Sequence, residues 1–298
     1  MRLLKVTDRC LKFKPIHKNL VWGYELWLLG GNTEVANSNI SLNDIMKESP
    51  QYLFGKGDVP PKFPLLIKFI STNEWLSIQV HPDNLIAQHL EKELWGKSEM
   101  WYFVQTEADS QIIHGFNFLI KSDELEKAIQ DKSIQRFLRF DHPNKSDWIY
   151  IPAGCIHALG KNLKLLEIQQ NSEITYRLYD WDRHEKDGNP RELHLSKALQ
   201  SIHFEDEKTH LRSDPLNQSL ENYQVKTIQL NGKKQLDTCG LSFHILIAIE
   251  KAVLIDHNFK LNPFECCLIP GSVGSYDIEG ENQQVFLIKK KGDLKCRV

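Results

Sequence analysis

Short apolar or alternating segments separated by turn residues dominate the chain between residues 64 and 181, and they limit its fold more than any other feature. They are PLLIKFI (64–70), WLSIQV (75–80), MWYFVQT (100–106), DWIYIPA (147–153), KLLEIQQ (164–170) and EITYRLYDW (173–181). Many short strands with this spacing are typical of a β-sandwich or barrel. Residues 39–54, 84–95 and 121–140 have helical periodicity, with Ser122 as the predicted N-cap of the last segment. The sequence therefore predicts a mainly β fold with helical insertions.

A polar, charge-mixed stretch follows the last of the strand-rich segments. It reads HFEDEKTHLRSDPLNQSLENYQ, and apolar segments resume after it. We therefore predict a catalytic domain over residues 1–205, a linker over 206–224 and a smaller β-domain over 225–298. The last part holds only His244 and His257 and no cluster of metal-ligating residue types. We expect it to have a packing or substrate-edge role.

Composition narrows the class of partner. Of the 298 residues, 41% are hydrophobic and 26% are charged, which is ordinary for a globular protein. The 37 Lys and Arg residues nearly cancel the 39 Asp and Glu residues. Without a basic field, neither nucleic acid nor an anionic membrane is an expected partner, and a small molecule is favoured. The oligomeric state stays open.

Charged residues between the apolar ones indicate where the protein is located. Charges break up the N-terminal segment MRLLKVTDRCLKFKP, and nowhere does the sequence contain eighteen consecutive apolar residues. Its six cysteines lack C-x-x-C spacing and are expected to be reduced thiols. We therefore predict a cytoplasmic protein.

Four potential metal ligands lie at the ends of the predicted strands. In SIQVHPDN, Gln79 and His81 are two positions apart and would project from the same face of a strand. Glu99 enters the strand of GKSEMWYFV, and His157 follows the turn of IPAGCIHALG. Nitrogen and oxygen donors of this kind suit zinc and tolerate manganese, iron or cobalt. The alternative is structural, because an isolated histidine is more often a hydrogen-bonded residue than a ligand.

Two motifs resemble the half-motifs of the cupin barrel. The P-x-G-x-x-H pattern ending at His157 resembles the second, and the Q-x-H pair resembles the first, with glutamine in place of the usual histidine. The chain further resembles the type I mannose-6-phosphate isomerases, above all their short bacterial form. The motifs that carry this resemblance are PLLIKFISTNEWLSIQVHPDN, GKSEMWYFV, IPAGCIHALG, LLEIQQNSEITYRLYDWDR and RELHLSKAL. The resemblance implies a cupin (jelly-roll) barrel with helical insertions and a smaller, degenerate cupin-like domain at the C-terminus.

The resemblance also implies a zinc-dependent aldose–ketose isomerase that interconverts mannose 6-phosphate and fructose 6-phosphate through an enediol(ate). One Zn²⁺ per chain would be bound by Gln79, His81, Glu99 and His157. Such a reaction needs a positive centre for the developing oxyanion and an acid/base that carries the proton.

Other charged residues enter the pocket by the same resemblance. Arg177 would stabilise the enediolate or grip the phosphate, because guanidinium suits planar oxyanions. Lys97 and Glu167 compete for the role of proton carrier, and the residues do not decide between them. Lys68, Ser77 and Arg183 are the expected phosphate contacts.

Two alternatives keep the cupin fold. One is an isomerase of another sugar or sugar phosphate. The other is a non-enzymatic, sugar-binding bicupin whose metal is structural or absent. Metal content measured beside isomerase activity separates the three hypotheses.

Overall fold

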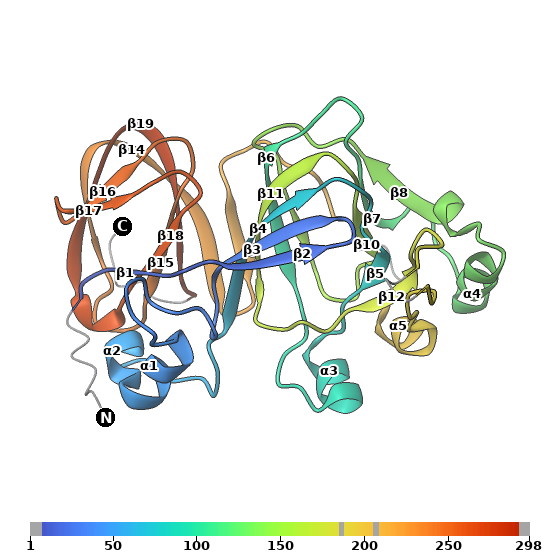
Figure 1. Ribbon diagram of the computed structural model, residues 1–298, viewed down its shortest axis with the longest axis horizontal. Helices are drawn as coiled ribbons and strands as arrows, with labels where there is room; N and C mark the ends of the chain where they lie inside the picture. Colours follow the sequence, from blue (N-terminus) through green and yellow to red (C-terminus); the bar gives the residue numbers. More distant parts are fainter. Residues whose placement is uncertain (1–7, 185–187, 205–208, 292–298) are drawn as a thin grey trace. The chain divides into compact units, whose positions relative to one another are not determined.

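The computed structural model describes residues 8–184, 188–204 and 209–291, and these form two compact units (Figure 1). Unit 1 groups the described residues of three segments, Met1–His17, Leu26–Lys68 and Pro215–Val298. Unit 2 groups those of Lys18–Glu25 and Phe69–Asp214. The units therefore interleave along the chain, whereas the predicted division into 1–205, 206–224 and 225–298 is sequential.

A five-stranded antiparallel sheet of unit 2, with the order β12-β5-β10-β7-β8, carries helices on one face. Its strands are β5 (Ile78–Val80), β7 (Ile112–Phe116), β8 (Leu138–Asp141), β10 (His157–Leu159) and β12 (Tyr176–Tyr179). The helical elements of this unit are α3 (Asn84–Glu91), α4 (Ser122–Gln130), the 3₁₀ helix η1 (Ile134–Phe137) and α5 (Leu195–Ser201). We call the apolar cluster between sheet and helices the helix-side core; it includes Ile78, Val80, Leu125, Ala158, Tyr176 and Ala198.

The other face of that sheet packs against a six-stranded sheet with the order β2-β3-β4-β11-β6-β9. Its strands are β2 (Ile16–Leu20), β3 (Gly23–Leu29), β4 (Leu65–Thr72), β6 (Glu99–Gln105), β9 (Trp148–Ile151) and β11 (Leu163–Gln170). The boundaries between the two units fall within β2, β3 and β4. We call the shared apolar cluster the inter-sheet core; it includes Trp101, Phe103, Ile112, Ile149, Leu159 and Leu165.

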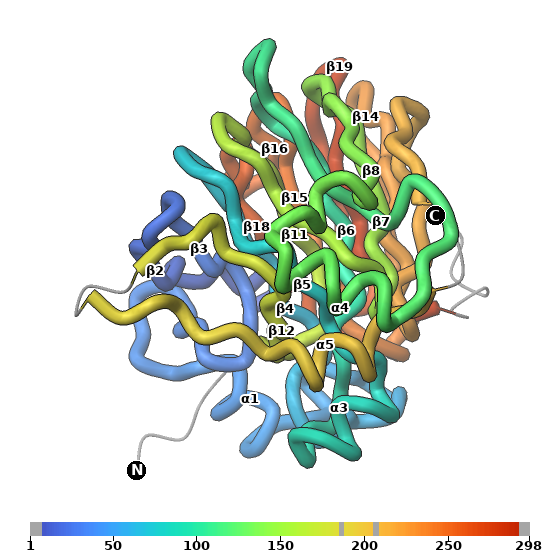
Figure 2. Tube along the Cα trace, turned by 90° about the vertical axis from the view of Figure 1, so that its right-hand side faces the viewer, coloured from blue at the N-terminus to red at the C-terminus, as the bar shows by residue number. Residues whose placement is uncertain are grey.

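Unit 1 contains an eight-stranded antiparallel sheet with the path β1-β18-β15-β19-β14-β13 and the pair β16 and β17 beside β19. Its strands are β1 (Leu11–Lys12), β13 (Asn217–Leu220), β14 (Tyr223–Asp237), β15 (His244–Ala248), β16 (Val253–Ile255), β17 (Phe259–Leu261), β18 (Cys266–Ile269) and β19 (Ser275–Lys290). The long strands β14 and β19 pair along nearly their whole length and run side by side in Figures 1 and 2. Its helical elements are α1 (Leu42–Glu48), α2 (Pro50–Phe54) and the 3₁₀ helix η2 (Gly271–Val273).

The mainly β class is confirmed, and most predicted strands and helices form near the expected residues. The helix predicted over residues 121–140 is wrong beyond residue 130, because Lys132 adopts a left-handed backbone with φ of 55° and residues 138–141 pair with β7 instead. Ser122 is the first helical residue and not the N-cap. The N-cap is Lys121, whose backbone N–H donates to Glu124 at 2.9 Å.

Three further predictions concern the linker, the cysteines and membrane-spanning helices. Strands β13 and β14 begin inside the predicted linker, whose residues 206–208 lie outside the described residues. Cys239 is disulfide-bonded, so the expectation of reduced thiols is wrong at that position, whereas Cys10, Cys155, Cys266 and Cys267 are free. In the described part of the chain, none of the helices has both the length and the apolar character needed to cross a membrane.

Candidate metal centre and active site

The inter-sheet core of unit 2 is polar at one end, and strand alternation explains why. Ile78 and Val80 point into the helix-side core, so Gln79 between them points to the opposite face. On β6, Glu99 precedes Trp101 by two positions and shares its face. His157 stands in the same relation to Leu159 on β10.

Cross-strand register then brings residues far apart in sequence together. Gln79 lies directly opposite His157 on one side and Arg177 on the other. Directly opposed residues of antiparallel strands project from the same face, so the three form a row across β10, β5 and β12. In the facing sheet, Glu167 lies opposite Trp101.

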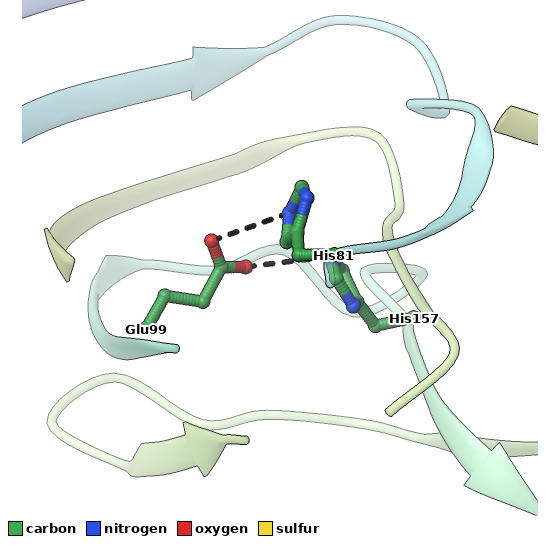
Figure 3. Close-up of side chains that lie close together, drawn as sticks. All are labelled: His81, Glu99 and His157. Carbon is green, nitrogen blue, oxygen red and sulfur yellow. Dashed lines mark ion pairs between the residues drawn. The ribbon is translucent and has the colours of Figure 1, made fainter. Parts of the chain in front are cut away.

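His81, Glu99 and His157 form the centre of this polar end (Figure 3). The carboxylate of Glu99 faces the two imidazoles, with Oε2 3.6 Å from Nε2 of His81 and Oε1 3.4 Å from Nε2 of His157. One donor atom from each residue lies within 4.8 Å of the others, and all three side chains are buried. Two imidazole nitrogens and one carboxylate at this spacing can hold a divalent metal ion.

Hydrogen bonds to the backbone fix both imidazoles. Nδ1 of His81 lies 2.8 Å from the carbonyl oxygen of Ile174, and Nδ1 of His157 lies 2.9 Å from that of Cys155. A carbonyl only accepts, so each Nδ1 donates and each Nε2 presents its lone pair. Burial lowers the pKa of His157 to about 4, which keeps this imidazole neutral near pH 7. Both rings are thus in the form that a metal ion requires.

Gln79 adjoins this centre through its amide. Its Nε2 lies 3.3 Å from Nε2 of His157, and its Oε1 accepts a hydrogen bond of 3.1 Å from the hydroxyl of Ser77. A half-turn of the amide would exchange its two ends and present Oε1 beside His157. Ser77, an expected phosphate contact, is buried and orients this glutamine.

Lys97 lies among the same lone pairs. Its ammonium is 2.9 Å from Nε2 of His81, forms a short ion pair with Oε2 of Glu99, and is 3.9 Å from Oε1 of Glu167. The side chain is 5% exposed, so these contacts form in a desolvated environment. The ammonium of Lys97 therefore lies where His81 and Glu99 converge. A donor set of nitrogen and oxygen lone pairs favours a cation at this place.

Trp101 is a site residue that sequence reasoning missed. Its indole Nε1 donates to Oε2 of Glu167 at 3.1 Å, and its ring packs edge-on against His157 with centroids 5.5 Å apart. Its spacing of two residues from Glu99 on one strand was the available signal. A buried indole needs a hydrogen-bond acceptor, and here it orients a carboxylate of the site.

Arg177 and His194 are joined through the backbone. Arg177 donates its N–H to Nδ1 of His194 at 3.3 Å, and its carbonyl accepts from the His194 N–H at 2.8 Å. Burial, followed by the charge of Arg177, lowers the pKa of His194. The start of α5 therefore holds the strand segment that carries Arg177.

The remaining expected phosphate residues lie in other surroundings. Arg183 pairs with buried Asp180, which also accepts from Arg191 at 2.8 Å. Nη1 of Arg183 is buried and makes no hydrogen bond within the described residues. Lys68 is buried in unit 1, with its ammonium 5.6 Å from the centroid of the Trp27 ring.

Comparison with known sequences points to one family. The sequence model of "Phosphomannose isomerase type I, catalytic domain" matches residues 24–103. The putative mannose-6-phosphate isomerase YvyI of Bacillus subtilis is 30% identical over 312 residues, which cover 92% of this chain and 97% of the relative. The mannose-6-phosphate isomerase ManA of the same organism is 36% identical over 222 residues, which cover 66% of this chain and 69% of the relative.

Solved structures agree with this result. The mannose 6-phosphate isomerase from Bacillus subtilis superposes with a TM-score of 0.83 at 26% identity, covering 95% of this chain and 100% of the other. A putative mannosephosphate isomerase from Archaeoglobus fulgidus has the same fold, with a TM-score of 0.80 at 19% identity over 96% of this chain and 99% of the other. The predicted cupin barrel is thereby confirmed.

Proposed function

This chain belongs to the type I mannose-6-phosphate isomerase family, and from that premise we propose that it interconverts mannose 6-phosphate and fructose 6-phosphate with one zinc ion per chain. The buried set of His81, Glu99 and His157 is the observation that carries the proposal. A binding protein needs no desolvated donor set beside a lysine and a second carboxylate, whereas proton transfer next to a carbonyl does.

The proposed zinc ligands are Gln79, His81, Glu99 and His157. The fit rests on two imidazoles whose Nδ1 atoms donate to carbonyls, on a carboxylate that faces both rings, and on an adjacent amide. When bound, the ion would supply a Lewis acid or a template for the sugar oxygens. With one carboxylate ligand, the centre would keep a net positive charge.

Lys97 and Glu167 are the proposed proton carriers for the enediol(ate) route. Their charged groups are 3.9 Å apart, and both side chains are nearly buried. Lys97 contacts two of the proposed ligands, which places its ammonium beside the proposed metal site. Glu167 is oriented by Trp101 and lies on the same strand face as the apolar core. Comparing Lys97→Met with Glu167→Gln in single-turnover proton exchange identifies the group that touches the substrate carbon.

Arg177 is the proposed partner of the substrate oxyanion, whether enediolate or phosphate. It continues the row of Gln79 and His157 across β12, which supports a place beside the ligands. Nη1 of Arg183 would gain a partner from a phosphate oxygen, because it has none within the described residues. Ser77 and Lys68 complete the proposed phosphate contacts, and Ser77 would have to share its hydroxyl with Gln79.

The test pairs metal analysis with isomerase assays. We expect about one zinc per chain, loss of activity on chelation, and recovery when zinc is restored. Mannose 6-phosphate should be converted far better than mannose, because a phosphate oxygen would accept from Nη1 of Arg183, which makes no hydrogen bond within the described residues. Comparable kcat/KM for free mannose would favour the general sugar isomerase, and full activity without metal would refute the zinc mechanism. His89→Ala is the control, since His89 is exposed on α3 and should affect neither metal nor rate.

The same proposal assigns the protein a small-molecule sugar phosphate as its partner and the cytoplasm as its location. The near balance of 37 basic and 39 acidic residues supports the first part, because it favours neither nucleic acid nor an anionic surface. Fractionation of cells with an antibody against the chain tests the second.

A further inference from the structure

A second polar cluster lies on the sheet of unit 1, where β15, β19 and β14 run side by side (Figure 1). His244 on β15 lies directly opposite Lys289 on β19. Lys226 on β14 lies opposite the residue two positions before Lys289 and therefore points to the same face. Two positions after His244 and Lys226, and two positions before Lys289, the strands place residues of the apolar core of this unit. They are Leu246, Ile228 and Leu287. The polar cluster thus continues a core-facing surface.

The second feature of this cluster is the positive charge of its two lysines. Lys289 is 8% exposed and Lys226 is partly buried. Within the described residues, neither ammonium forms an ion pair or a hydrogen bond. Asp237 acts on His244, but its oxygens accept from the N–H of Cys239 at 2.6 Å and the hydroxyl of Ser275 at 2.7 Å. Lysines are rarely buried without a partner. Within the described residues, this cluster therefore lacks a negative charge beside its ammonium groups.

His244 adds a hydrogen-bond donor to this cluster. Its Nδ1 lies 2.8 Å from the hydroxyl of Tyr276, and burial raises the pKa of that tyrosine well above its ordinary value. Burial also lowers the pKa of His244 to about 3, so both groups are neutral near pH 7. If the hydroxyl donates to Nδ1, the imidazole proton is on Nε2. This Nε2 is buried and has no hydrogen-bond partner in the described part of the chain, which is costly for a polar atom.

We propose that His244, Lys226 and Lys289 form a binding site for a small oxyanion of the phosphate type. Two ammonium groups match the charge of a phosphate dianion, and the imidazole N–H offers a further donor. The partial exposure of Lys226 leaves the cluster reachable from solvent. The site stands on residues of unit 1 alone and does not depend on the proposed isomerase reaction.

A site-resolved footprint tests the proposal on the full chain. Lysine acetylation is followed by mass spectrometry with and without inorganic phosphate, at constant ionic strength set with chloride. We expect phosphate to slow acetylation of Lys226 and Lys289 by on the order of tenfold, because a bound anion covers both ammonium groups. Lys260, exposed on β17, is the internal control and should react at the same rate throughout. Equal rates at Lys226 with and without phosphate would overturn the site.

A pair of variants separates anion binding from a structural role. Inorganic phosphate should raise the melting temperature of the wild type, and Lys289→Met should lose the part of this rise that the unit 1 site provides. Lys260→Met should keep the whole rise. Without phosphate, Lys289→Met should melt no lower than the wild type, because it removes an uncompensated buried charge. A variant that keeps the full phosphate effect, or that melts lower without phosphate, contradicts the proposal.

Discussion

The polar clusters of the two β units differ in chemistry. In unit 2, the strand face beyond the apolar core gathers lone pairs, from two imidazole Nε2 atoms and from the carboxylate of Glu99. In unit 1, the cluster beside the apolar core instead gathers the ammonium groups of Lys226 and Lys289 and the imidazole of His244. Both patterns replace apolar residues at one end of a strand face. The charge of these polar side chains decides whether the cluster suits a cation or an anion.

Histidine illustrates how neighbours set this difference. His157 directs Nδ1 to a carbonyl, which can only accept, so its Nε2 presents a lone pair. His244 directs Nδ1 to a hydroxyl, which can donate and leave the proton on Nε2. The same side chain, buried in both units, is therefore a proposed metal ligand in one and a proposed anion donor in the other.

The largest expected effect is the loss of zinc and activity when a proposed metal ligand of unit 2 is removed. His157→Ala should remove most of the bound zinc and lower kcat/KM by at least on the order of a thousandfold, because the ligand set loses a neutral imidazole. His244→Ala, which removes a buried imidazole of unit 1, should keep zinc at the wild-type level. Metal analysis and steady-state kinetics on both variants provide the check. Equal zinc loss in the two variants would mean that the metal depends on general stability and not on this site.

The next effect concerns charge stabilisation in unit 2. Arg177→Lys should keep zinc and lower kcat by about a hundredfold to a thousandfold, since an ammonium lacks the planar two-pronged geometry of guanidinium. A rise in KM at unchanged kcat would instead identify Arg177 as a phosphate anchor. Unchanged kcat and KM would remove it from the site.

A smaller effect is expected for the carboxylate that Trp101 orients. Trp101→Phe keeps an aromatic ring beside His157 but removes the N–H that Glu167 accepts. We expect kcat to fall about tenfold with KM and zinc content unchanged, because a hydrogen bond to a charged group contributes about 1.5–3 kcal/mol. Trp148→Phe is the matched control, because its indole donates to the backbone of Asp214 and not to a site residue. Similar losses in both variants would make Trp101 a packing residue only.

The smallest effect concerns stability in acid, to which buried His244 of unit 1 contributes. The pKa of His244 falls from 6.5 to about 3 on folding, so only the unfolded chain gains this proton between those values. Its contribution therefore makes the free energy of unfolding fall as pH falls, by about 2 kcal/mol between pH 7 and pH 5. His244→Phe should flatten this part of the pH profile in denaturant titrations, whereas His257→Phe, at an exposed position, should not. An unchanged slope in His244→Phe would show that the imidazole is already charged in the folded protein.

The sequence by itself determined the local part of this protein. Two-residue alternation predicted that Gln79 and His81 share a strand face, and the four proposed ligands were named from strand ends. Alternation depends only on backbone geometry, which neighbouring residues set. Helical periodicity, the other local signal, failed for residues 138–141, which pair with β7.

Tertiary structure alone decided which strand faces meet. The row of Arg177, Gln79 and His157 depends on the register of three strands far apart in sequence, and no local pattern encodes that register. The pairing of Trp101 with Glu167 and of His244 with Lys289 arises in the same way. Whether a buried imidazole accepts a cation or donates to an anion is set by groups that only folding brings to its other nitrogen.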